Sequence, residues 1–149
     1  MTQYCNDIGK LGEKLAINYL KEKGCKILAH HYTTHWGELD IIAKKDITIC
    51  FVEVKTRVGL FKGKPYEAVG YYKIRSLMRA IQFYLANFNY KNYHYSLDVI
   101  SILLNNDNTV QSLQYFSNIN NWLRIIYRRI YFTSPYCARI LVVIDLIVK

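Results

Sequence analysis

The chain has 149 residues, of which 52% are hydrophobic and 21% are charged. This composition excludes a disordered polypeptide, and the length suffices for one domain with its own hydrophobic core. Twenty lysines and arginines against eleven acidic residues give a net charge of +9, which favours a polyanionic partner or a membrane surface, with ordinary solubility charge as the alternative.

The pattern of the first 57 residues predicts one helix and three strands. The helix is expected over about residues 6–23, with Asn6 or Asp7 as its cap and Gly24 at its end. Three apolar segments of high β-propensity follow, and the short link at residues 45–46 predicts a hairpin between the last two. We expect these strands over residues 26–32, 37–44 and 47–57.

The next part begins with a loop of two glycines and two lysines over residues 58–64 and a turn over residues 65–69. A second helix is expected over residues 71–87, then a strand over 95–104 and a short edge strand over 110–116. The expected apolar stripes are Leu11, Leu15, Tyr19 and Leu20 in the first helix, and Tyr72, Leu77, Ala80, Ile81, Tyr84 and Leu85 in the second. This order predicts an α/β fold with a mixed sheet flanked by helices.

The last segment differs from the rest, so we divide the chain into a domain over residues 1–121 and a C-terminal extension over residues 122–149. The extension fits a helix followed by a strand, and its apolar end suits packing on the domain, a partner or a second copy in a homodimer. Its longest apolar run is interrupted by Asp145 and is too short to span a bilayer, which takes roughly 20 residues.

The cysteines and the first residues bear on the compartment. No two of the four cysteines have the C-x-x-C spacing of a zinc ribbon. The N-terminus lacks the basic-then-apolar pattern of a signal peptide. We therefore expect reduced thiols and a cytoplasmic location.

Charged residues occur where the predicted strands should carry only core residues. Glu53 and Lys55 lie two positions apart in an otherwise apolar strand, so their side chains project from the same face. Hairpin pairing would place Asp40 of the preceding strand close to Glu53. Charges on a buried strand are costly unless they are paired or hold a metal, so these residues are the candidate site.

The chemistry of this group suits phosphodiester hydrolysis. Two adjacent carboxylates repel each other, and Mg²⁺, which prefers carboxylate oxygens and retains several waters, would relieve the repulsion. Such an ion polarises a phosphate and acidifies a bound water, while Lys55 can orient that water or offset charge on the phosphate. The alternative is a buried salt-bridge network of Asp40, Glu53 and Lys55 without catalysis.

Asp40 with Glu53-Val54-Lys55 resembles the active-site signature of the restriction-endonuclease-like PD-(D/E)XK superfamily. More closely, the chain resembles the YraN-like family of small bacterial predicted endonucleases. The similarity spans roughly residues 7 to 118, and its blocks are Gly12-Glu13-Lys14-Leu15-Ala16, residues 37–43, residues 51–57, residues 65–69 with Lys73, and Leu97-Asp98-Val99-Ile100.

The resemblance implies a restriction-endonuclease-like αβββαβ core and a Mg²⁺-dependent or Mn²⁺-dependent DNA endonuclease, a hydrolase acting in repair or recombination. It implies that Asp40, Glu53 and the backbone carbonyl of Val54 bind the metal and that Lys55 is the catalytic lysine. Glu13 matches the acidic residue of the first helix and is a further candidate ligand and catalytic residue. Glu38, on the same strand as Asp40, is a candidate supporting residue.

Basic residues near this group suit phosphate contacts: Arg57, Lys62, Lys64, Lys73, Arg75 and Arg79. Trp36 and the tyrosines could stack on unpaired bases, although packing explains them equally well. No segment has the pattern of a sequence-specific recognition helix, so we expect structure-selective or weakly selective binding of nucleic acid, with DNA as the expected partner. The alternative function is a non-catalytic nucleic-acid-binding protein that retains the nuclease fold.

One stretch departs from the family pattern. Before the Gly-Glu motif the family usually has an Asn-aromatic-Arg sequence, whereas residues 31–36 are His-Tyr-Thr-Thr-His-Trp, so one expected phosphate contact is lost. His30, His31 and His35 lack the cysteines that would complete a typical zinc site, and we expect them to be polar residues at a strand end.

Overall fold

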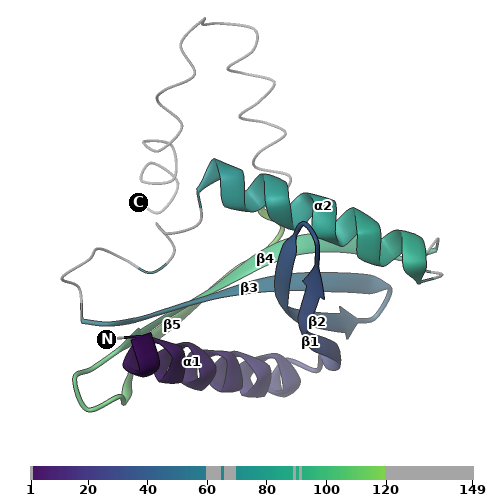
Figure 1. The fold of residues 1–149 in the computed structure, drawn as a ribbon. Helices are drawn as coiled ribbons and strands as arrows, with labels where there is room; N and C mark the ends of the chain where they lie inside the picture. Colours follow the sequence, from purple (N-terminus) through teal and green to yellow (C-terminus); the bar gives the residue numbers. More distant parts are fainter. Residues whose placement is uncertain (1, 60–64, 66–69, 89, 91, 120–149) are drawn as a thin grey trace, which may run out of the picture.

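The computed structural model contains a five-stranded mixed sheet with one helix on each face (Figure 1). It describes residues 2–59, 65, 70–88, 90 and 92–119. The predicted α/β class and αβββαβ order are confirmed, with an edge strand added at the end. The elements are α1 (Thr2–Glu22), β1 (Lys26–Thr34), β2 (Gly37–Lys45), β3 (Thr48–Val58), α2 (Tyr71–Asn87), β4 (His94–Leu104) and β5 (Val110–Phe116).

The strands follow the order β1-β2-β3-β4-β5 across the sheet. All neighbours are antiparallel except β3 and β4, which are parallel. Because parallel strands cannot be joined by a tight turn, the chain crosses from β3 to β4 through α2. The predicted loop over residues 58–64 begins one residue later than expected, because Val58 still belongs to β3. Its residues 60–64, most of the turn over residues 65–69 and the extension over residues 122–149 lie outside the described residues.

The predicted bounds of α2 and β5 agree with the structure, but α1 begins at Thr2 rather than at Asn6 or Asp7. The segment before Asn6 contains neither proline nor glycine, so nothing in it ends the helix, and the preference of Asn and Asp for caps is a weak local effect. Neither α1 nor α2 combines the length and the apolar character that crossing a bilayer requires.

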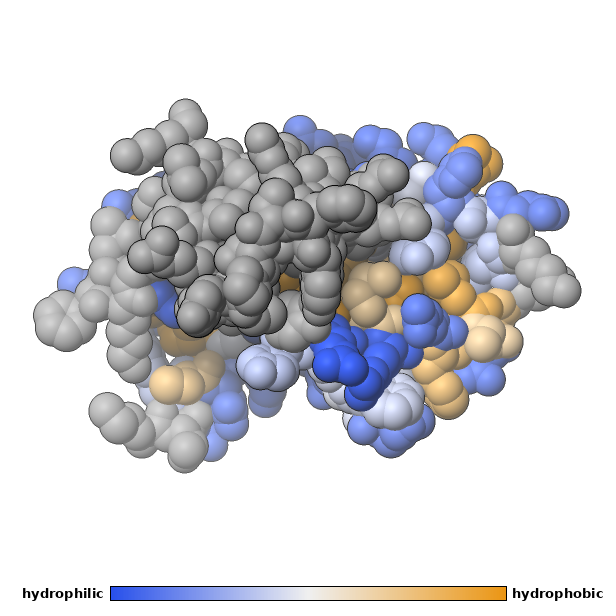
Figure 2. All heavy atoms as spheres, turned by 90° about the horizontal axis from the view of Figure 1, so that it is seen from above, coloured by the Kyte–Doolittle hydropathy of each residue, from blue (hydrophilic) through white to orange (hydrophobic). Residues whose placement is uncertain are grey.

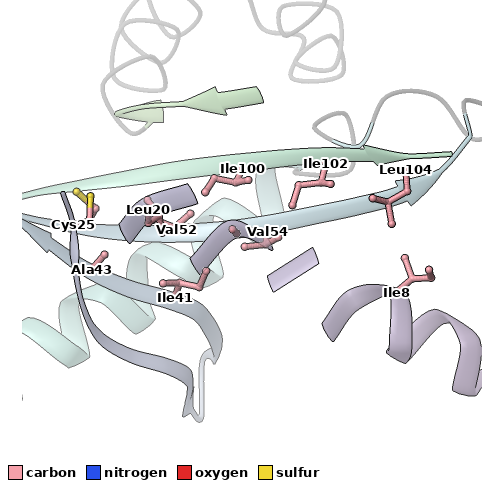
Figure 3. Close-up of a cluster of buried hydrophobic side chains, with 12 residues drawn as sticks. Ile8, Leu20, Cys25, Ile41, Ala43, Val52, Val54, Ile100, Ile102 and Leu104 are labelled. Atoms are coloured by element: carbon pink, nitrogen blue, oxygen red, sulfur yellow. The ribbon is translucent and has the colours of Figure 1, made fainter. Parts of the chain in front are cut away.

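The core on the α1 side of the sheet depends on small residues. The predicted stripe of α1 is wrong in part, because Leu11, Leu15 and Tyr19 are only partly buried. The buried apolar residues of α1 are instead Ile8, Ala16 and Leu20. They belong to a cluster of buried side chains from α1, from the residue before β1 and from β2, β3 and β4 (Figure 3), among them Cys25, Ile41, Ala43, Val52, Val54, Ile100, Ile102 and Leu104.

Gly12 sets the distance between α1 and β3. A methyl group at this position would lie 1.7 Å from Oγ1 of Thr56 and 2.8 Å from its Cβ, so rotation of the threonine side chain cannot remove the collision. Gly9, one turn earlier, has no atom within 4 Å of the same construction. Of these two glycines, only Gly12 is therefore required for the close approach of α1 to β3.

The core on the α2 side contains a larger set of side chains. Buried residues of α2 pack on Leu39, Phe51 and Leu97 of the sheet; they are Ile74, Leu77, Ala80, Ile81 and Tyr84. Tyr72 was expected in this stripe, but 83% of its surface is exposed. It precedes the buried Ile74 by two residues, about 200° around the helix, and therefore points away from the sheet.

On the α1 side a buried carboxylate fixes the edge of the sheet. Asp98 of β4 is 1% exposed and lies beside Val52 of β3. Its Oδ1 accepts the backbone N–H of Asn118 at 2.7 Å, and its Oδ2 accepts the hydroxyls of Tyr115 at 2.6 Å and Ser96 at 3.1 Å. Both oxygens are thus satisfied by protein donors, which holds β5 and the residues after it against β4.

We expect Gly12→Ala to destabilise the protein by about 1–3 kcal/mol, because α1 must move away from β3 to admit the new methyl group. The matched control is Gly9→Ala, which adds a methyl group to open space in the same helix and should stabilise the protein by roughly 0.5–1 kcal/mol. Urea unfolding of the two variants measures both values. Effects of the same sign would contradict this account of Gly12.

Candidate active site

The candidate site lies where β2 separates from β3. Backbone pairing of the two strands runs from Lys45 and Thr48 to Ile41 and Val52, and the next pair in this register would be Asp40 and Glu53. Beyond the last backbone pair, the side chain of Asp40 replaces a backbone acceptor: its Oδ2 accepts the backbone N–H of Val54 at 2.8 Å. The two carboxylates that the sequence analysis placed near each other are therefore brought together.

The twist of β2 at this point has a visible signature. Leu39 packs in the α2-side cluster whereas Ile41 packs in the α1-side cluster, although residues two apart in a flat strand share a face. The strand therefore turns at Asp40. The backbone pairing of β2 with β3 ends here, and beyond its end the side chain of Asp40 accepts the N–H of Val54.

Glu53 is the most unusual residue of the group. Its side chain is 0% exposed, and its Oε1 contacts Nζ of Lys55 at 2.5 Å and Nζ of Lys73 at 3.1 Å. Its Oε2 is buried and has no hydrogen-bond partner among the residues that the structure describes. A buried carboxylate oxygen without a partner is costly, so this atom is a place for a further ligand.

Burial and the charge of Glu53 disfavour the ionised form of Asp40. Burial, followed by the charge of Glu53, raises its pKa to about 6, against a usual value near 4. The N–H of Val54 and the charges of Lys55 and Lys73 act in the opposite direction. Asp40 would therefore gain from a cation that the two lysines do not provide.

The residues fit a hard divalent cation. The free Oε2 of Glu53, the carboxylate of Asp40 and the backbone carbonyl of Val54 are oxygen donors, which Mg²⁺ and Mn²⁺ prefer. Among the described residues no group of three or more His, Cys, Asp and Glu side chains is arranged to hold a metal ion. Any ion bound here would therefore use backbone oxygen and water in addition to the two carboxylates, as Mg²⁺ commonly does.

The other two acidic candidates are engaged elsewhere. Oε2 of Glu13 lies 2.8 Å from Nε2 of His31, and Oε1 of Glu38 lies 2.8 Å from Nδ1 of the same ring. The hydrogen bond to Glu38 and the charge of Glu13 raise the pKa of His31. Burial raises the pKa of Glu13, and this effect outweighs the opposing charge of His31. The role of Glu13 as a ligand stays a prediction.

His31 is a residue whose position sequence reasoning missed. Its backbone has a positive φ of 53°, and its ring joins α1 to β2 through the two carboxylates. The only local signal was the departure of residues 31–36 from the family pattern. Its partners lie 18 positions before it and 7 after it, so spacing alone could not identify them.

Among the residues predicted to contact phosphate, Lys73 lies in the candidate site itself. It lies in the first turn of α2 and contacts Glu53. Arg57 is half-buried near the end of β3, while Arg75 and Arg79 are exposed on α2. Lys62 and Lys64 lie outside the described residues.

Comparison with known proteins extends the similarity over most of the chain. Residues 12–102 match the model of the uncharacterised protein family UPF0102. A UPF0102 protein of Caldanaerobacter subterraneus subsp. tengcongensis is 42% identical over 98 residues, which cover 66% of this chain and 80% of that protein. A relative from Clostridium botulinum strain 657 is 38% identical over 117 residues, covering 77% of this chain and 95% of its own. Another relative, from Clostridium acetobutylicum, is 41% identical over 110 residues, which cover 74% of this chain and 90% of that protein.

Asp40→Asn should stabilise the protein at pH 8 and leave its stability close to that of the unmodified protein at pH 4. The substitution removes the charge but keeps an oxygen for the N–H of Val54. Because the pKa of Asp40 is raised on folding, its ionised form opposes folding, so stability falls as the pH rises through about 4 to 6. We expect a gain of about 2–3 kcal/mol at pH 8 in urea unfolding.

Asp107→Asn serves as the control for this measurement. Hydrogen bonds from Thr109 lower the pKa of the exposed Asp107 carboxyl, so removal of its charge should act in the opposite direction. Equal stability of Asp40→Asn and the unmodified protein at pH 8 would show that Asp40 is not under electrostatic stress.

Proposed function

The chain belongs to the uncharacterised protein family UPF0102, the YraN-like family that its motifs resemble, and we propose that it is a metal-dependent nuclease that hydrolyses phosphodiester bonds in DNA. The observation that carries the proposal is the buried carboxylate of Glu53. One of its oxygens is held by two lysines, the other has no partner in the described part of the chain, and Asp40 is its neighbour in the register of β2 and β3.

This asymmetry favours a metal site over a purely structural network of charges. A structural network would satisfy both oxygens of a buried carboxylate, as the donors around Asp98 do. At Glu53 both cations contact the same oxygen. The second oxygen of Glu53 and the stressed carboxyl of Asp40 are therefore left for a shared ligand of positive charge.

The proposed roles follow from the positions of the residues. Asp40, Glu53 and the carbonyl of Val54 would hold Mg²⁺ or Mn²⁺, which when bound supplies polarisation of a phosphate oxygen and a water of lowered pKa. Lys55, whose Nζ lies 2.5 Å from Glu53, would orient the attacking water and offset negative charge on the phosphate. Lys73 holds the same oxygen of Glu53 from α2 and positions it.

The charge of the surrounding surface supports DNA as the substrate. The sequence of α2 contains Lys73, Arg75 and Arg79 and no Asp or Glu. The whole chain carries a net charge of +9. A basic helix next to a carboxylate site suits a phosphate backbone, and we place the activity among endonucleases of repair or recombination that act on branched, nicked or single-stranded DNA.

The second candidate function is binding of nucleic acid without cleavage. The ion pairs of Lys55 and Lys73 already neutralise the charge of Glu53, so the fold does not require a metal at this position. This function predicts an affinity for DNA that falls with salt concentration and does not respond to divalent ions.

Cleavage of branched, nicked and single-stranded DNA in the presence of Mg²⁺ or Mn²⁺ tests the proposal. We expect the unmodified protein to cut at least one of these substrates, and Glu53→Gln and Lys55→Ala each to lose roughly 100-fold or more of the rate. Glu22→Gln, which removes the charge of an exposed glutamate at the end of α1, should retain full activity.

The outcomes separate the two functions. Equal cleavage by the Glu53→Gln variant would contradict the proposed roles. Absence of cleavage, together with metal-independent and salt-sensitive binding of DNA, would establish the second candidate. A divalent ion that raises the melting temperature of the unmodified protein but not that of Glu53→Gln would support the metal site independently of activity.

A further inference from the structure

The turn between β1 and β2 is fixed on the outer side of α2, where the tip of the hairpin reaches the helix (Figure 1). The hydroxyl of Ser76 in α2 donates to the backbone carbonyl of Trp36. Within the turn, the hydroxyl of Thr34 accepts the N–H of Trp36 at 3.1 Å and donates to the carbonyl of Gly37 at 2.8 Å. These bonds hold the backbone of Trp36 in one position.

Aromatic rings and a guanidinium group gather at this contact. The guanidinium carbon of Arg79 lies 4.7 Å from the centre of the Trp36 ring. The ring of His35 lies 4.2 Å from that of Trp36 and meets the ring of Phe83 edge-on at 5.9 Å. We call these four residues, His35, Trp36, Arg79 and Phe83, the Trp36 shelf. Trp36 and Phe83 remain 39% and 41% exposed, so the shelf offers ring surface to a ligand.

Helix α2 connects the shelf to the candidate active site. Lys73 contacts Glu53, Ser76 contacts Trp36 three residues later, and Arg79 contacts the Trp36 ring after three more. Lys73 and Arg79 are separated by about 9 Å along the helix axis and by about 120° around it. A nucleic acid strand with one phosphate at the carboxylates would therefore pass around α2 to bring a nearby nucleotide to the shelf.

The charges around the shelf favour a polyanionic ligand. Aromatic rings and arginine are also common at protein interfaces, but α2 presents three cations and no acidic residue beside these rings. On the face seen from above, hydrophobic and strongly hydrophilic surfaces adjoin each other (Figure 2). Exposed rings combined with arginines are the arrangement that binds single-stranded nucleic acid, because every unpaired base has a face to stack, and a duplex hides these faces.

We propose that the Trp36 shelf stacks on an unpaired base next to the phosphate that is cleaved. This inference rests on the proposed function and gives its substrate class: DNA with a single-stranded segment at the site, such as a flap, a gap or an open junction arm. The exposed part of the Trp36 ring receives the base, and Arg79 holds the ring and the neighbouring phosphate. The strand then enters the site around α2 from the shelf to Lys73.

Binding of a short oligothymidylate without divalent ions tests the shelf separately from cleavage. Because the chain has two tryptophans, Trp122→Phe leaves Trp36 as the sole tryptophan, and its fluorescence should be quenched by the oligonucleotide. In Glu53→Gln protein, which keeps cleavage out of the measurement, Trp36→Ala should weaken the affinity about tenfold or more, and Trp36→Phe should restore most of it. Tyr4→Ala, at a ring of α1 that is 55% exposed, should have no effect.

Three results would overturn the shelf. The first is an unchanged affinity of Trp36→Ala for the oligonucleotide, and the second is an equal loss of its affinity for blunt duplex DNA. The third is a change from dimer to monomer in solution on Trp36→Ala, which would assign this face to contact between copies of the chain. None of them depends on cleavage. An active nuclease with an unaffected Trp36→Ala variant would refute the shelf alone, and a functional shelf on a protein that never cuts would refute the nuclease alone.

Discussion

A carboxylate with no exposure to water, placed on a central strand, is the constraint on which this structure depends. A buried carboxylate is costly unless positive charge reaches it, and the fold brings that charge to Glu53 from two directions: Lys55 from its own strand and Lys73 from α2. The departure of β2 from β3 admits Asp40 to the same place. The position of α2 is therefore coupled to the electrostatics of the sheet as well as to its apolar packing.

The two faces of the sheet show what an acidic residue can do in this protein. Asp98 and Glu53 are both buried, and they lie on the neighbouring strands β4 and β3. Asp98 has donors for each of its oxygens and serves the edge of the sheet. Glu53 has a surplus of cations on one oxygen and no described partner on the other. The same chemical group thus has a structural environment on one face and an environment suited to a ligand on the other.

Local patterns predicted much of the fold and the centre of the candidate site. The bounds of α2 and β5 follow from the periodicity of apolar residues within each segment. The pairing that brings Asp40 to Glu53 follows from the short turn between β2 and β3. Both signals involve residues that are close in sequence. Long-range contacts were harder to predict. The partner of Lys73 lies 20 positions away in another element, and the ring of His31 bridges α1 and β2. Tyr72 was placed in the wrong stripe although its position is out of phase with Leu77 and Ile81. Lys62, Lys64 and the extension over residues 122–149 fall outside the described residues.

The topology also gives an order of assembly. The β2–β3 hairpin closes through a short turn, whereas β3 and β4 pair residues 46 positions apart, such as Thr48 and His94, and require α2 to cross between them. Local hairpins close faster than such distant pairings. We therefore expect the hairpin to bring Asp40 and Glu53 together before Lys73 reaches them, so that in the unfinished chain solvent water surrounds the two carboxylates where the lysine later lies.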